Sequence, residues 1–160
     1  MKKFEFTGET KQVELLFRTA TLHRIKAVAE FGIVKVGDLG GWIEKEENLS
    51  HEGKAWVWGD AEVYGDAKVW GNAKVCGDAE VFSISHVLVI GPIGSRNDFT
   101  TFFRDKDSEI TVKCGCFLGK IDKFLKKVCE THGDSQYAIV YRTAVEIAKQ
   151  QIDLSEEKQL

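Results

Sequence analysis

Five six-residue repeats follow one another in the middle of the chain, and they restrict its possible folds more than any other feature. They read GKAWVW, GDAEVY, GDAKVW, GNAKVC and GDAEVF from Gly53 to Phe82, and a degenerate sixth, SISHVL, ends at Leu88. Each of the five holds Ala and Val two positions apart, an alternation that puts both side chains on one face of a short strand. Each also begins with Gly, usually followed by Asp or Asn, which are turn residues. Such a pattern predicts short strands that stack, each pairing with its equivalent one turn of the chain away.

The hexads resemble those of left-handed parallel β-helix proteins, in which three hexads form one triangular turn. The resemblance implies a mostly β fold, with full turns over residues 53–88 and an earlier turn beginning at Gly37. We therefore predict three segments. These are an N-terminal cap over residues 1–36, a left-handed parallel β-helix over 37–93, and a small α/β appendage, a β-hairpin followed by two helices, over 94–160.

The residues after position 93 follow a different pattern. Thr100–Arg104 and Ile110–Cys114 are strand-like and flank the polar Asp105–Ser108, which predicts a hairpin. A helix is expected next, because four apolar residues recur at helical spacing: Ile121, Phe124, Leu125 and Val128. Gly133 is expected to end it, and a second helix follows.

Large apolar residues occupy the position after the Val of each hexad, where the side chain points away from the interior. They are Trp58, Tyr64, Trp70, Cys76, Phe82 and Leu88. On an isolated coil they would form an exposed apolar strip of the kind that marks an interface. Either other copies of the chain or its own terminal segments could cover them. We favour association, and the resemblance implies a homotrimer.

Charge and composition limit the cellular compartment and the classes of partner that we expect. The chain has 22 Lys and Arg against 25 Asp and Glu, a net charge of −3, so a nucleic-acid polymer is not expected as a partner. We find neither a membrane-length apolar run nor a signal-peptide pattern, and expect a cytoplasmic protein without a membrane partner. The four cysteines are then expected to be reduced thiols.

Four further stretches sharpen the resemblance: Val36–Ser50, Ile90–Phe103, Cys114–Phe117 and Thr131–Asp134. They are similar to uncharacterised hexapeptide-repeat proteins of phages and prophages, some of which are labelled as acyltransferases. The resemblance implies a protein of the host-cell cytoplasm. It also suggests an anti-defence role, in which a nucleotide immune signal of the host is sequestered.

One loop has the composition of an anion site. Within Gly91–Asp98, Ser95, Arg96 and Asn97 combine an arginine fork with small polar side chains and free backbone N–H groups. The structural alternative is a corner in which Arg96 pairs with Asp98. With Thr101 nearby, we predict that Ser95, Arg96, Asn97 and Thr101 contact the ligand. The resulting hypothesis is a non-enzymatic trimer that sequesters a small anionic, nucleotide-like ligand at its subunit junctions.

Three other readings remain open. An acyltransferase would use His86 as a general base, on an outward face beside Lys68. A protein-binding scaffold would dock its partner on Trp58 and Trp70. Zinc would need the set Cys114, Cys116, Cys129 and His132. Because one residue between the first two cysteines is fewer than structural zinc sites use, we predict no metal and no cofactor.

Overall fold

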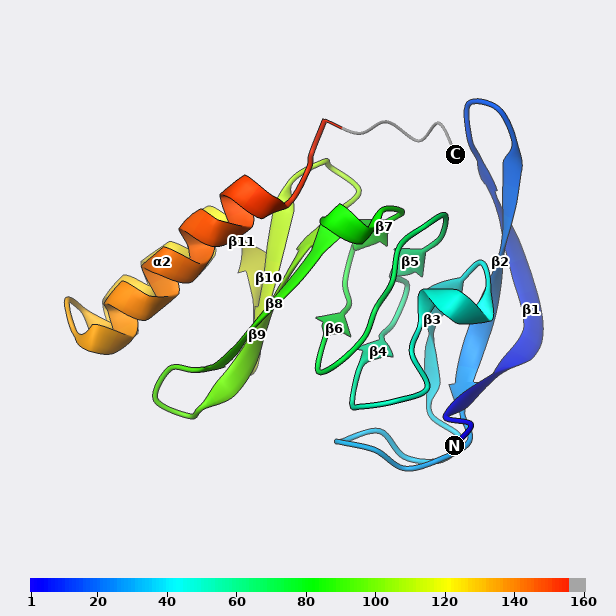
Figure 1. Cartoon of the computed structure of the whole chain (residues 1–160), viewed down its shortest axis with the longest axis horizontal. Coiled ribbons are helices and arrows are strands. Elements are labelled where there is room, and N and C mark those ends of the chain that lie inside the picture. Colours follow the sequence, from blue (N-terminus) through cyan, green and yellow to red (C-terminus); the bar gives the residue numbers. More distant parts are fainter. Residues whose placement is uncertain (156–160) are drawn as a thin grey trace.

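The molecule is built as a row of layers (Figure 1). At one end, helices α1 (Ile121–His132) and α2 (Gln136–Gln151) cover a four-stranded sheet. The hexads come next, and a long hairpin lies at the other end. This computed structural model describes residues 1–155. Within that range, no helix is both long enough and apolar enough to cross a bilayer.

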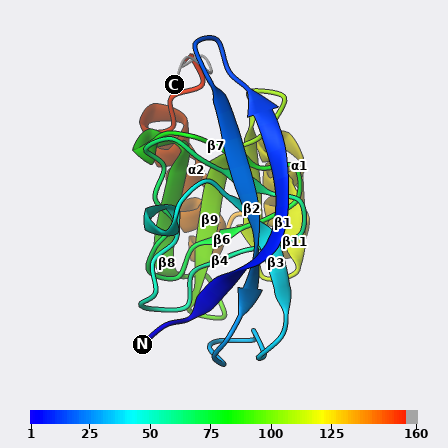
Figure 2. The ribbon, with the colours of Figure 1, turned by 90° about the vertical axis from the view of Figure 1, so that its right-hand side faces the viewer.

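The N-terminal hairpin consists of β1 (Phe4–Glu14) and β2 (Thr19–Ala27), which pair antiparallel. Strand β3 (Leu39–Ile43) continues the sheet on the other edge of β2. Figure 2 shows the hairpin running across this end of the molecule. It therefore covers part of the repeat segment.

Four of the five hexads form strands of two residues each, and the third makes only an isolated bridge through Val69. The strands are β4 (Trp56–Val57), β5 (Glu62–Val63), β6 (Lys74–Val75) and β7 (Glu80–Val81). Strands β4 and β6 pair in parallel, as do β5 and β7, with an offset of 18 residues in both cases. The Ala and Val side chains of all five hexads are buried: Ala55, Val57, Ala61, Val63, Ala67, Val69, Ala73, Val75, Ala79 and Val81. The predicted common face of Ala and Val is therefore the interior face.

The predicted fold class, a mostly β left-handed parallel β-helix, is wrong. The protein has mixed α and β structure, with a mixed sheet of order β1-β2-β3-β5-β7, an antiparallel sheet of order β11-β10-β9-β8 and the separate pair β4-β6. The hexads offer only two residues of pairing per strand and are too few to stack further. The long strands on either side pair antiparallel and make most of the sheet.

The C-terminal sheet contains β8 (Val87–Ile93), β9 (Asp98–Arg104), β10 (Ile110–Cys114) and β11 (Phe117–Lys120). The predicted hairpin of β9 and β10 is confirmed. Strand β8, which the sequence pattern assigned to the repeats, pairs with β9 instead. The two faces of this sheet enter different cores, because Phe102 packs with the helices while its neighbour Phe103 packs with the hexads.

The chain itself covers part of the outward apolar strip. The Tyr64 and Phe82 rings stack at 5.4 Å and are completely buried, in a cluster with Ala20 and Leu22 of β2 and Trp42 of β3. Of the six outward residues, all within the described range, Trp70 alone is exposed, at 63%. Most of the exposure from which a trimer was expected is therefore absent.

Candidate ligand-binding site

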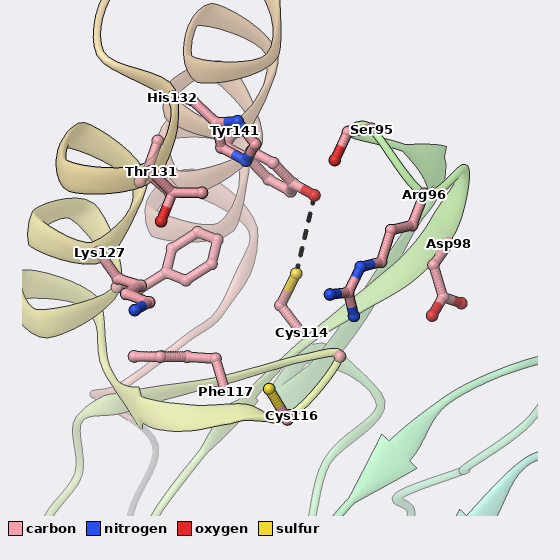
Figure 3. Close-up of a pocket in the computed structure, with 13 residues that line it drawn as sticks. Ser95, Arg96, Asp98, Cys114, Cys116, Phe117, Lys127, Thr131, His132 and Tyr141 are labelled. Carbon is pink, nitrogen blue, oxygen red and sulfur yellow. Dashed lines mark hydrogen bonds between the residues drawn. The ribbon is translucent and has the colours of Figure 1, made fainter.

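A cavity of about 200 Å³ lies where the β8–β9 turn and the β10–β11 turn meet the two helices (Figure 3). We call it the Arg96 cavity. All the residues named below belong to one chain, and the placement of the ligand at subunit junctions stays a prediction. The lining residues are Ser95, Arg96, Asp98, Cys114, Gly115, Cys116, Phe117, Phe124, Lys127, Val128, Thr131, His132 and Tyr141.

The β8–β9 turn presents two polar side chains to the cavity. The carbonyl oxygen of Gly94 accepts a hydrogen bond from the N–H of Asn97 at 3.2 Å, so Ser95 and Arg96 are the central residues of the turn. Asn97 has a φ of 49°, a left-handed conformation that Asn tolerates better than most residues. Figure 3 shows Ser95 and Arg96 at the rim, with the guanidinium extending into the cavity.

Gly94 allows this turn to touch helix α2. A Cβ atom on Gly94 would lie 1.9 Å from Oη of Tyr141, closer than any real contact, and its φ is +77°. No other residue fits here without displacing the tyrosine or the turn. The packing therefore fixes the distance between the turn that carries Arg96 and the helix that carries Tyr141.

The Tyr141 hydroxyl ends a short polar chain. Thr100 Oγ1 donates to Cys114 Sγ at 3.4 Å, and that thiol donates to Tyr141 Oη at 3.9 Å. Burial, with a smaller contribution from Cys114, raises the pKa of Tyr141 to about 12. The phenol is therefore protonated at neutral pH. Since Oη accepts from Cys114, its own hydrogen is left to donate to a ligand.

Aromatic rings form the apolar part of the lining. Phe117 lies against Gly119, where an added Cβ would come within 3.0 Å of its ring. The Phe117 and Phe124 ring centroids are 5.4 Å apart, and His132 stacks on Tyr141 at 5.7 Å. These surfaces suit a planar apolar group.

Two cations face this apolar surface. Figure 3 shows Arg96 and Lys127 on opposite sides of the cavity, one on the β8–β9 turn and the other on α1. Asp98 is the one carboxylate in the lining, and it lies beyond Arg96 in this view. The arrangement suits an anion that carries a flat ring.

Of the four predicted ligand contacts, the structure brings Ser95 and Arg96 to the cavity, while Asn97 and Thr101 lie outside its lining. Asn97 closes the turn through its backbone N–H. Thr101 is 1% exposed, and its Oγ1 accepts a hydrogen bond from the Lys74 N–H at 3.0 Å. Because side chains alternate along β9, Thr101 points to the hexads and Thr100 points to the cavity side.

The residues weighed for zinc are divided. Cys114, Cys116 and His132 line the Arg96 cavity, while Cys129 is exposed and outside its lining. Within residues 1–155, no three His, Cys, Asp or Glu side chains are grouped so that they could hold a metal ion.

His86 is in the interior, and the expected outward position is wrong. Its ring is completely buried, Nδ1 accepts a hydrogen bond from the Phe82 N–H at 3.2 Å, and the Phe82 ring packs edge-on at 4.5 Å. Burial, aided by the nearby charge of Arg104, lowers the pKa of His86 to about 4. The side chain has a packing role, and an acyltransferase base at this position has no access to a substrate.

Sequence reasoning did not assign Phe117, Lys127, Thr131 or Tyr141 to the site. A signal was nevertheless present, because three of the stretches that carried the phage resemblance each supply lining residues: Ile90–Phe103, Cys114–Phe117 and Thr131–Asp134. The sequence alone did not show that these stretches meet.

Comparison with known proteins gives no family for this chain, since no protein-family model matches it and no curated protein matches it at a significant level. The functional argument therefore depends on the geometry of the site.

Proposed function

We propose that this protein binds a small anionic, nucleotide-like ligand in the Arg96 cavity and sequesters it without chemical change. The observation that carries the proposal is the pairing of Arg96 and Lys127 with an aromatic-lined cavity that also holds three hydroxyl groups, from Ser95, Thr131 and Tyr141.

Each part of such a ligand has a partner in the lining. The Arg96 guanidinium is suited to two parallel hydrogen bonds with a phosphate, and Ser95 on the same turn can donate a third. Tyr141 supplies a neutral donor. The Phe117 ring offers a face on which a base can stack, a contact that tolerates different bases.

Sequestration follows from how these groups are held. The cavity wall combines two hairpin turns with two packed helices, and the contact between Gly94 and Tyr141 fixes one turn against α2. A preorganised site loses little free energy in ordering on binding, which favours slow release. The resemblance to phage proteins supports a nucleotide signal of the host, bound in the host cytoplasm, as the target.

A thermal-shift screen with nucleotides and acyl-coenzyme A tests the proposal. A ligand at a hundred times its Kd stabilises the folded state by about 2.7 kcal/mol, so a true ligand raises the Tm measurably. We expect a nucleotide to raise the Tm of the wild type and of W70A, whose change is far from the cavity, but not that of R96Q. Chromatography of the mixture should recover the nucleotide unchanged.

Two results would overturn this function. One is a panel without any Tm shift, and the other is conversion of the bound nucleotide to a product. Transfer of the acyl group from acyl-coenzyme A to an acceptor, rather than a Tm shift with it, would favour the acyltransferase reading. Loss of a captured protein in W70A, with no nucleotide effect, would favour the scaffold.

A further inference from the structure

The two cations of the Arg96 cavity occupy separate ends of it. Arg96 is on the turn after β8, and Lys127 is on α1, the helix that follows β11. Figure 3 shows their side chains on opposite sides of the cavity, with Phe117 along its lower edge. One compact anion placed at Arg96 leaves Lys127 without a ligand group.

Each cation is accompanied by a hydroxyl group of its own. Ser95 is the neighbour of Arg96 in the turn, and both line the cavity. Thr131 is four residues after Lys127 on α1, which places the two on the same face of the helix, and both line the cavity as well. The lining thus repeats the combination of a cation and a hydroxyl at two places.

The space between these two places suits a flat group. Phe117 and Phe124 supply the rings, with centroids 5.4 Å apart, and such a lining suits one planar group. Asp98 carries the one carboxylate among the lining residues, and it lies at the Arg96 end. No carboxylate of the lining lies beside Lys127.

We infer that the ligand carries two separate anionic groups together with a single planar ring system, as a nucleoside bisphosphate does. Arg96 and Ser95 take one group, and Lys127 and Thr131 take the other. This inference depends on the proposed function and specifies the ligand class for the same cavity.

Calorimetry with two probes tests the inference. Adenosine 3′,5′-bisphosphate should bind at least about tenfold more tightly than adenosine 5′-monophosphate, since one further charge-assisted contact contributes about 1.4 kcal/mol or more. In K127Q this advantage should disappear, because the bisphosphate then binds like the monophosphate. In R96Q both probes should bind more weakly.

The matched control is K126Q, which removes the charge of a neighbouring exposed lysine of α1 that is not part of the lining. It should leave the advantage intact. Equal affinities of the two probes for the wild type, or an advantage that survives in K127Q, overturn the two-anion inference and leave the binding function standing. Absence of binding by either probe overturns the inference, and the broader nucleotide panel then decides the function.

Discussion

At the scale of single residues, two glycines shape the Arg96 cavity by what they lack. Gly94 leaves room for the Tyr141 hydroxyl, and Gly119 leaves room for the Phe117 ring. The sequence does not show either role. Gly94 and Tyr141 are far apart in the chain, and the contact of Gly119 with Phe117 depends on where the phenylalanine ring lies on its strand. The sequence did predict Ser95 and Arg96 as candidate contacts, because an arginine fork beside small polar side chains suits an anion, and both line the cavity.

His86 gives a prediction about pH at the same scale. An unfolded imidazole gains its proton as the pH falls below about 6.5, whereas in the folded protein burial and Arg104 hold the pKa of His86 to about 4. The unfolded state therefore binds more protons between these values, and the free energy of unfolding falls as the pH falls through that window. The free energy of unfolding has its full value above about pH 6.5. Up to about 3 kcal/mol of it is lost by pH 4.

Urea unfolding at several pH values from 7 to 4 measures this dependence. The variant H86Q keeps a hydrogen-bond acceptor and does not titrate, so it should be less stable at pH 7 but lose less stability on acidification. An identical pH slope in wild type and variant would contradict the assignment.

At the scale of elements, the local sequence pattern predicted those helices and strands whose structure depends mainly on their own residues. The apolar spacing from Ile121 to Val128 gave α1, and Gly133 ends it with a φ of 56°. The Thr101 error shows the limit, because a shift of one position along β9 moves a side chain from the cavity to the hexads. The pairing partner of β8 was missed because only tertiary packing decides it.

The turn between β9 and β10 depends on one buried carboxylate. The Asp105 side chain is 0% exposed and accepts hydrogen bonds from Thr111 Oγ1 and Lys120 Nζ, both at 2.6 Å, and from the backbone N–H groups of Asp107 and Glu109. Burial alone would raise the pKa of Asp105, but the hydrogen bonds from Lys120 and Thr111 outweigh it and lower the pKa. This network ties the turn to β11, whose first residue is Phe117 of the cavity.

Removal of this carboxylate should be costly. D105A leaves four donors without their acceptor, and we expect a loss of about 3 kcal/mol in the free energy of unfolding. The control is D107A. The Asp107 side chain also pairs with Lys120 but is 57% exposed, so its removal should lower the free energy of unfolding by less than about 1 kcal/mol. Chemical denaturation compares the two, and equal losses would argue against the buried network.

At the scale of the whole molecule, the period of the repeats was predicted correctly, but the fold inferred from them was wrong. The 18-residue offset and the buried Ala and Val agree with the pattern. The antiparallel sheets that dominate the fold come from segments without a repeat, and there the sequence offered no comparable signal. For the same reason the covering of Tyr64 and Phe82 by the chain's own hairpin was the less favoured alternative.

Because one chain supplies cations, hydroxyl groups and aromatic rings in the same cavity, we expect one ligand per chain. The affinity should be independent of protein concentration, whatever the oligomeric state. Calorimetry at several protein concentrations, with the mass in solution measured alongside, checks this expectation. A stoichiometry of one ligand per three chains, or an affinity that falls as an oligomer dissociates, would restore the subunit junction as the binding place.

Phe102 and Phe103 point to opposite faces of the C-terminal sheet, and this separation affects how the length of such a protein can change in evolution. The proposed binding site is on the helix side of the C-terminal sheet, and the hexads are on the other side. Eighteen-residue units could then be gained or lost in the middle of the molecule during evolution. Its length would vary while its selectivity stayed the same.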